Sequence, residues 1–202
     1  MFPDDKFKDL EYPGGCEDPR VAMTEDGLYV AFYTAWNRKI ARLAVATSRD
    51  LVNWEKHGLA FGKAYKGGRF EELFCKSASI LTTIKNDKIV IEKINGKYFM
   101  YWGGERAIHA ATSDDLINWE PVLDDNNQLK IIAQPRDGHF DSLFTECGPP
   151  ALLTGKGGLS CCITEKTGKR WKRRSRLSIR GILCRTDIVR CQRSIQSIGQ
   201  IR

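Results

Sequence analysis

A ten-residue segment occurs twice in this 202-residue chain, and this internal repeat constrains the fold more than any other feature. The copies are ATSRDLVNWE, from Ala46 to Glu55, and ATSDDLINWE, from Ala111 to Glu120, and eight of their ten positions are identical. A hairpin pattern precedes each copy: Asp-Gly or Asn-Gly supplies a turn ahead of an aromatic-rich strand, in DGLYVAFYTAW and NGKYFMYWGGE. Repeated units of short strands predict β-propeller blades, because a blade buries its faces only against its neighbours.

Two details of the repeat carry further expectations. Asp50 and Asp115 are predicted to cap a turn, while Trp54 and Trp119 pack beneath their blades rather than taking part in catalysis. The first copy has four more residues between its hairpin strand and the ATS segment, which predicts a longer loop there.

Charge divides the chain into two parts. Residues 1–155 carry 19 basic and 23 acidic residues, whereas residues 156–202 carry 13 basic residues against two acidic ones. We expect residues 1–155 to form an incomplete propeller domain and the basic tail, residues 156–202, to lie outside it. The run KTGKRWKRRSR resembles a nuclear-localisation or nucleic-acid patch, and a solvated disordered tail is the usual alternative.

A third explanation of the tail fits its composition better. Read one base later, the codons for residues 168–202 can encode a stretch with Asn-Asp-Pro turn chemistry and an aromatic-rich strand pattern. The hypothesis is that insertions or deletions altered the reading frame after about Gly158. Resequencing the DNA tests this hypothesis, and an intact frame would refute it.

Cysteine usage and hydropathy indicate a reducing compartment. Cys16, Cys75 and Cys147 show neither zinc-site spacing nor a disulfide framework, so they are expected to be free thiols. No apolar run approaches membrane-spanning length, and the charged start lacks the apolar stretch of a signal peptide. The sequence therefore predicts a cytoplasmic protein without a membrane partner.

Three acidic motifs, GGCEDPR, YWGGE and FDSLFTECGPP, stand where strands give way to loops. In the first motif, Pro19 restricts Asp18 to an extended conformation, and Arg20 is able to hold a neighbouring carboxylate. An ordinary Asp-Pro turn with a salt bridge explains that motif equally simply, and spacing alone favours this plainer interpretation.

Taken together, GGCEDPRV, the two ATS units, KSASI, NGKYFMYWGGE and FDSLFTECGPPALLT resemble glycoside hydrolase family 130 over most of residues 14–154. The resemblance implies an all-β fold that is part of a five-bladed propeller, with two to three blades present. The family contains β-mannoside phosphorylases and β-mannosidases, and both invert the anomeric centre.

The resemblance also implies roles for three carboxylates. Asp18 matches the proton donor of the family, and Glu105 and Glu146 match a pair of glutamates that activates water in its hydrolases. Inversion requires the acid and the base to lie about 6.5 to 9.5 Å apart on opposite sides of the sugar. Neither a metal nor a cofactor is required, although inorganic phosphate is the co-substrate if the enzyme is a phosphorylase.

Further side chains are candidates for binding the substrate. Lys76 is placed to bind phosphate or a sugar hydroxyl, with a solvated surface as the equal alternative. Asp141 either binds a hydroxyl or caps its own turn. Aromatic residues such as Tyr33, Trp36 and Trp102 offer stacking faces but are more often core. The set of expected binding residues is Arg20, Lys76, Trp102, Arg136, His139 and Asp141.

The function predicted from these residues is an inverting glycosidase that acts on β-linked mannosides or manno-oligosaccharides. The alternatives are a β-mannoside phosphorylase that releases mannose 1-phosphate and a non-catalytic carbohydrate-binding propeller. The expected partner is a small oligosaccharide and not a nucleic acid. Because an unclosed propeller leaves sheet faces exposed, the 202-residue chain is expected to be an inactive and poorly soluble fragment.

Overall fold

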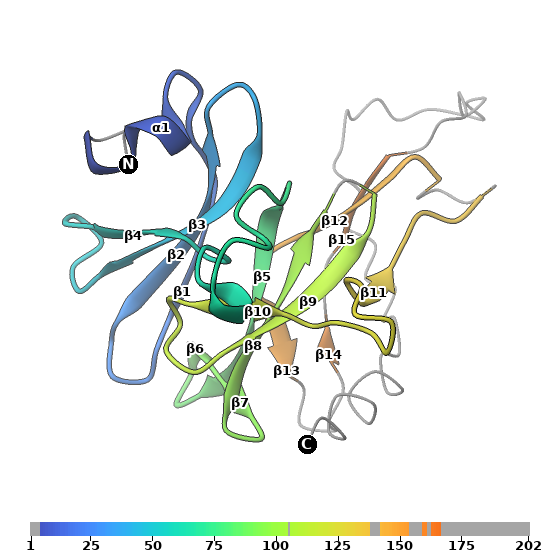
Figure 1. Ribbon diagram of the computed structural model, residues 1–202. Helices are drawn as coiled ribbons and strands as arrows, with labels where there is room; N and C mark the ends of the chain where they lie inside the picture. Colours follow the sequence, from blue (N-terminus) through green and yellow to red (C-terminus); the bar gives the residue numbers. More distant parts are fainter. Residues whose placement is uncertain (1–4, 105, 138–141, 154–158, 161–162, 167–202) are drawn as a thin grey trace, which may run out of the picture.

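The chain consists almost entirely of β-structure. The computed structural model describes residues 5–104, 106–137, 142–153, 159–160 and 163–166. A short helical segment, η1 (Asp5–Phe7) and α1 (Lys8–Glu11), precedes the first strand. The strands that follow form two four-stranded fans, seen in Figure 1 as a blue-to-cyan group and a green-to-yellow group.

The first fan is an antiparallel blade whose strands pair in chain order. It contains β1 (Gly15–Met23), β2 (Tyr29–Trp36), β3 (Ala41–Ser48) and β4 (Glu55–Leu59). The turn between β1 and β2 contains the Asp-Gly dipeptide, and Gly27 there has a φ of 83°, which glycine adopts without steric cost.

The second fan repeats this arrangement. Its main strands pair in the order β5 (Lys76–Lys85), β8 (Lys97–Gly103), β9 (Ile108–Ser113) and β10 (Trp119–Pro121). Three short strands extend it: β6 (Lys88–Ile91), β7 (Lys93–Ile94) and β11 (Ile131–Ala133). The fans meet where β6 pairs with both β5 and β1, and a linker containing η2 (Ala64–Lys66) connects them.

The remaining strands belong to neither fan. They are β12 (Phe144–Cys147), β13 (Ala151–Leu153), β14 (Leu159–Ser160) and β15 (Ile163–Lys166). β12 pairs with β15, and β13 pairs with β14 and, in parallel, with β5. Strand pairing therefore continues past residue 155, where the sequence predicts the end of the propeller domain. The tail beyond Lys166 lies outside the described residues.

The hairpins show that the four extra residues of the first repeat do not lengthen a loop. Both hairpin loops, residues 37–40 and 104–107, contain four residues. Instead β2 and β3 pair from Tyr29 and Ser48 to Trp36 and Ala41, two cross-strand pairs more than β8 and β9. The loop prediction is therefore wrong. Adding two residues to each arm preserves the side-chain alternation, so the buried face of the hairpin is unchanged.

Aromatic side chains join the two blades. Phe32 of the first blade meets Trp119 of the second edge-on, with ring centroids 5.5 Å apart. Phe61, in the linker, lies 5.1 Å from Trp102. All four rings are buried in one cluster, and such pairs contribute about 0.5 to 1.5 kcal/mol each beyond the burial of their area. The interface between the blades is thus a continuous apolar core.

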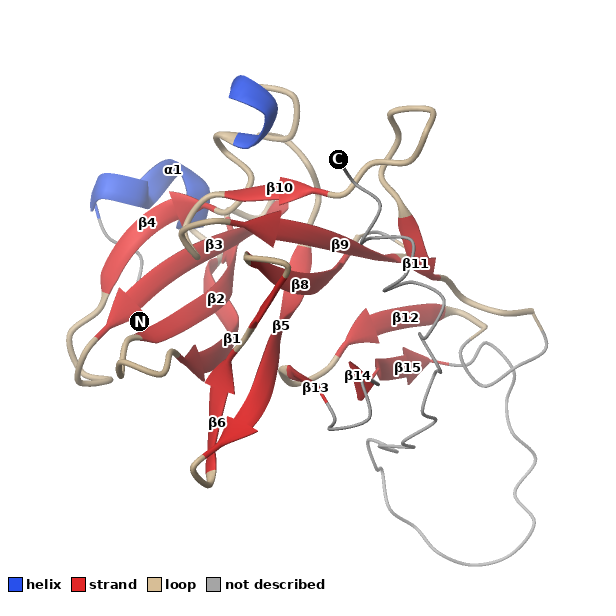
Figure 2. Ribbon diagram, turned by 90° about the horizontal axis from the view of Figure 1, so that it is seen from below, coloured by secondary structure: helices blue, strands red, loops and turns tan. Residues whose placement is uncertain are grey.

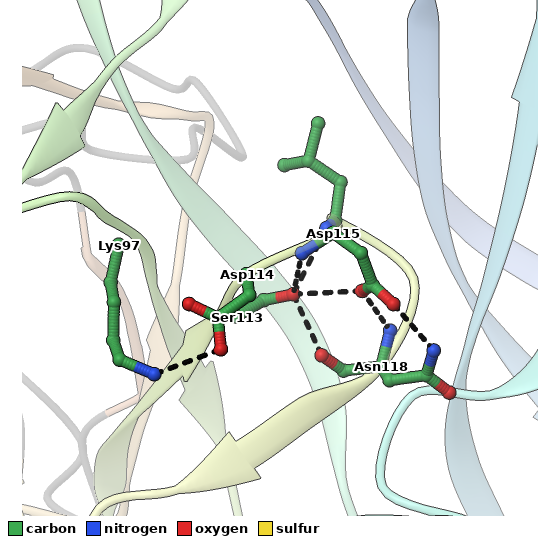
Figure 3. A network of polar contacts seen from close by, with 6 residues as sticks. Lys97, Ser113, Asp114, Asp115 and Asn118 are labelled. Carbon is green, nitrogen blue, oxygen red and sulfur yellow. Dashed lines mark hydrogen bonds and ion pairs between the residues drawn. The ribbon is translucent and has the colours of Figure 1, made fainter.

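The two repeats close with the same polar turn, shown for the second copy in Figure 3. One carboxylate oxygen of Asp115 accepts hydrogen bonds from the backbone N–H groups of Ile117 and Asn118 at 2.9 and 2.7 Å, and Asp50 does the same for Val52 and Asn53. Burial acts to raise the pKa of Asp115, but these hydrogen bonds outweigh it and hold the pKa below the usual range. The predicted capping role of both aspartates is confirmed.

A buried ion pair fastens the N-terminal segment to the first blade. Glu11 of α1 is fully buried, and its carboxylate accepts hydrogen bonds from Lys56 Nζ at 2.6 Å and the Tyr33 hydroxyl at 2.7 Å. The charges are paired and hydrogen-bonded, which is the condition for tolerating ions in a protein interior. This contact fixes the chain immediately before the GGCEDPR strand.

Two expectations about composition can be compared with the structure. Cys16, Cys75 and Cys147 are free thiols, as the sequence predicts. Among the described residues, no helix has the length and apolar character needed to cross a membrane.

Candidate active site

The innermost strands of both blades share a bulge at the same place. The pairing of β1 with β2 shifts register between Glu17 and Arg20, and that of β5 with β8 shifts between Lys76 and Ser79. The residues within these bulges, Asp18 and Ser77, have positive φ values of 48° and 54°. Such strained positions often mark functional sites, and bulges redirect side chains away from the sheet ladder.

Asp18 lies exposed in its bulge, as an acid that protonates a substrate must. The strand reaches this position by passing close to its neighbour. A Cβ atom placed on Gly14 would lie 2.2 Å from the carbonyl oxygen of Trp36, a distance that no side chain can occupy. Gly14 therefore permits the close backbone approach that the GGCEDPR motif predicts.

Glu146 meets the corresponding bulge of the second blade. Oε1 of Glu146 lies 2.7 Å from Lys76 Nζ and accepts a hydrogen bond from Ser77 Oγ at 2.5 Å. The Glu146 side chain is only partly accessible, at 15 %. The ammonium group and the hydroxyl orient this carboxylate, so Glu146 and Lys76, from two separate motifs, belong to one cluster. We call Lys76, Ser77 and Glu146 the carboxylate cluster.

The YWGGE motif approaches the same cluster. A Cβ atom on Gly103 would lie 3.6 Å from Cγ of Glu146, so the end of β8 runs directly beside that side chain. β12, which carries Glu146, packs against both β8 and β5. Figure 2 shows β5, β8 and β12 gathered in this part of the fold. Glu105, two residues after Gly103, lies outside the described residues.

Arg20 connects the first motif to the third. Its Nη1 atom donates a hydrogen bond to the carbonyl oxygen of Gly148, two residues after Glu146. The sequence suggests that Arg20 holds a carboxylate or binds substrate, whereas here its printed partner is a backbone carbonyl. The guanidinium group therefore ties the Asp18 strand to the Glu146 strand, and its contact with a sugar stays a prediction.

Trp102 corrects one expectation. Its side chain is 0 % exposed and packs 4.7 Å from the ring of His109, in the core between the blades. The ring has no face available for a sugar, so the predicted binding role is wrong for the structure described. Tyr33 is buried as well, because it supports Glu11. The aromatic positions of these strands serve the core, as aromatic strand residues usually do.

The other predicted residues are less informative. Arg136 is exposed in the segment after β11. His139 and Asp141 lie outside the described residues, so their roles stay predictions. In the described part of the chain, no group of three or more His, Cys, Asp or Glu side chains is arranged to hold a metal ion.

Ser77 is the residue that sequence reasoning missed. A signal for it exists, because Cys16-Glu17-Asp18 and Cys75-Lys76-Ser77 are equivalent positions on the inner strands of the two blades. Aligning the repeats from these cysteines would have placed Ser77 where the first blade has Asp18. Only two of the three positions differ, but their chemistry changes from acidic to basic and neutral, which hides the correspondence.

Comparison with protein families gives one match to most of the chain. Residues 3–171 match the model of glycoside hydrolase family 130, which is described as beta-1,4-mannooligosaccharide phosphorylase. A curated relative, a 1,2-beta-oligomannan phosphorylase from Thermoanaerobacter sp. (strain X514), is 31% identical over 146 residues. That match covers 71% of this chain and 40% of the relative.

Solved structures agree with this match. A proposed glycoside hydrolase from Bacteroides ovatus ATCC 8483 is 69% identical with a TM-score of 0.79, over 82% of this chain and 48% of its own. A second structure is 57% identical with a TM-score of 0.80, over 83% of this chain and 46% of its own. Its title states that family 130 of mannoside phosphorylases contains glycoside hydrolases that target beta-1,2 mannosidic linkages in Candida mannan. The chain thus spans less than half the length of these relatives, and the prediction of a partial β-propeller is confirmed.

Proposed function

Because this chain belongs to glycoside hydrolase family 130, we propose that the enzyme containing it hydrolyses β-1,2-linked mannosides with inversion of the anomeric centre. The β-1,2 linkage is supported by the names of two relatives, the oligomannan phosphorylase and the 57% identical structure. The proposal assigns Asp18 as the general acid. Glu146, together with Glu105, activates the attacking water.

The carboxylate cluster carries the proposal of hydrolysis. Lys76 is the basic residue best placed to bind phosphate, yet its ammonium group lies 2.7 Å from Glu146 Oε1. A phosphate anion on Lys76 would lie beside the Glu146 carboxylate, and like charges at such a distance repel. A water molecule carries no such penalty, and an oriented carboxylate is suited to accept its proton.

In the proposed reaction, Asp18 protonates the leaving oxygen as the glycosidic bond breaks. Water attacks the anomeric carbon from the opposite face, and a glutamate accepts its proton, so the product forms with inverted configuration. Lys76 and Ser77 orient Glu146 for this step. Arg20 acts at a distance from the sugar, by holding the Gly148 carbonyl and thereby the loop that follows Glu146.

Phosphorolysis is the second candidate, and the names of the family model and of the curated relative favour it. The same acid would serve, with inorganic phosphate in place of water. A non-catalytic carbohydrate-binding propeller is the third interpretation, and it predicts no turnover under any condition.

The experiment uses the full-length enzyme that contains these residues, incubated with β-1,2-mannobiose with and without phosphate. Hydrolysis predicts that mannose appears at the same rate in both, first as the α-anomer, as followed by NMR. Mannose 1-phosphate that forms only with phosphate would establish phosphorolysis instead. Asp18→Asn and Glu146→Gln are expected to lose turnover by about 100-fold or more. The exposed Asp114, whose partner is Lys97 on β8, offers Asp114→Asn as the matched control without effect.

A further inference from the structure

The two polar turns that close the repeats are alike internally but differ in what covers them. Ser48, Asp50 and Asn53 form the same hydrogen bonds as Ser113, Asp115 and Asn118, the copy drawn in Figure 3. The indole N–H of Trp54 donates to Leu51 O at 3.1 Å, and that of Trp119 donates to Leu116 O at 2.9 Å. Differences between the two sites therefore reflect their neighbours and not their own conformation.

In the second repeat, the linker from the first blade covers the turn. The backbone N–H of Trp119 donates to Ala60 O at 2.9 Å, and the Tyr65 hydroxyl donates to Pro121 O at 2.7 Å. Lys63 and Ala64 line what remains of the space, a cavity of about 140 Å³. As a result Trp119 is 0 % exposed and Leu116 only 4 %.

In the first repeat, the equivalent space is open. Its lining residues occupy the same repeat positions, from Thr47 to Glu55, but the cavity measures about 520 Å³. Leu51, the counterpart of Leu116, is 50 % exposed, and Val52 is 79 % exposed. Trp54 is only half-buried. We call the surface formed by Leu28, Leu51, Val52 and Trp54 the open notch.

The N-terminal segment covers a different part of the first blade. Leu10 packs against the cluster that contains Tyr33, and Glu11 accepts a hydrogen bond from the Tyr33 hydroxyl. Tyr33 is the repeat counterpart of Trp102, which the linker residue Phe61 covers in the second blade. The helix therefore replaces one half of the linker, and no described residue replaces the other half.

We propose that the open notch receives the linker of a further propeller blade, supplied by the part of the full-length enzyme that this chain does not include. The expected segment follows the pattern of Ala60–Tyr65: small, aromatic, glycine, any residue, alanine, aromatic. A second copy of this chain is a poor donor, because its own Ala60 and Tyr65 are engaged on Trp119 and Pro121. The relatives are about twice as long as the matched region, so the full-length enzyme has room for such a blade.

A peptide with the sequence of Leu59–Lys66, acetylated and amidated, tests the proposal on the 202-residue chain. Added to ¹⁵N-labelled protein, it is expected to shift the amide signals of Leu51 to Glu55 and the indole signal of Trp54, saturably. The dissociation constant should be on the order of 1 mM, since a short flexible peptide loses much entropy on binding. The signals of Leu116 to Glu120 should stay in place, because their site is already filled.

Two controls make the result decisive. Leu51→Asp should abolish the shifts and keep the fold, since Leu51 is exposed at a φ of 63° that aspartate tolerates. A peptide with Ala64→Asp and Tyr65→Ala should not bind. Absence of any shift, or equal shifts at both turns, would overturn the proposal.

A second measurement on the same chain requires no peptide affinity. Leu116→Asp should lower the melting temperature by about 5 °C or more, and Leu51→Asp should leave it nearly unchanged. Equal effects of the two substitutions would show that the notch is already filled and would contradict the proposal.

Discussion

The ammonium group of Lys76 lies 2.7 Å from Oε1 of Glu146, the same oxygen to which Ser77 donates a hydrogen bond. β5 supplies the two donors, and β12 supplies the carboxylate. The contact therefore exists only when the second blade and the strand that follows it are packed together. It defines the end of the site opposite to the strand that carries Asp18.

Replacing Lys76 tests the orientation of Glu146. In the full-length enzyme, Lys76→Met is expected to lower kcat by about 10- to 100-fold, because Glu146 loses its charged partner while Ser77 remains. Lys76→Arg keeps the charge and should retain more activity. Steady-state kinetics on β-1,2-mannobiose measures both. An increase in KM with an unchanged kcat would instead assign Lys76 to binding the substrate.

Arg20 is expected to matter for stability as well as activity. Arg20→Met leaves the partly buried carbonyl of Gly148 without its charged donor, which should cost about 1.5 to 3 kcal/mol of unfolding free energy in the 202-residue chain. Urea denaturation measures this loss. If stability is unchanged and only the KM of the full-length enzyme rises, Arg20 serves the sugar and not the loop.

The buried pair of Glu11 and Lys56 should show the cost of an unpaired charge. Glu11→Gln removes one partner of a 2.6 Å ion pair and should destabilise the chain by about 3 to 5 kcal/mol. The double variant Glu11→Gln with Lys56→Met should recover much of that loss. The exposed pair of Asp26 and Arg49 is the matched control, and Asp26→Asn should cost less than about 1 kcal/mol.

The buried thiol of Cys75 should make the chain less stable in alkali. Burial raises the pKa of Cys75 to about 12 from a usual value of 9.0. Between these pH values the unfolded chain releases the thiol proton and the folded chain keeps it, so rising pH favours unfolding. The unfolding free energy should fall by about 1.4 kcal/mol per pH unit through this group.

Urea denaturation at pH 8, 9.5 and 10.5 checks the effect of pH. Cys75→Ser keeps an acceptor for the Leu43 N–H, which donates to Sγ at 3.2 Å, and removes the titrating thiol. The variant should show a correspondingly flatter dependence on pH. The same slope in both proteins would exclude Cys75 as the cause.

The repeat and its turn residues were readable from the sequence because their chemistry is local. Asp115 bonds to backbone groups two and three residues away, and the Asn-Gly dipeptide forms its turn within one hairpin. Alternating strands and the acidic motifs likewise depend on short spacings. These features determined the all-β fold, the two blades and the identity of the candidate carboxylates.

Contacts between blades were decided only by the tertiary structure. Nothing in the sequence around Trp102 distinguishes a ring that stacks on sugar from one that packs on Phe61, because both require the same side chain on the same strand. Ser77 gained a role only when β12 brought Glu146 to it. Likewise, Leu51 and Leu116 occupy equivalent repeat positions, and only the neighbouring linker makes one exposed and the other buried. Burial and partnership depend on what packs across an element, and that information is distributed over segments far apart in the chain.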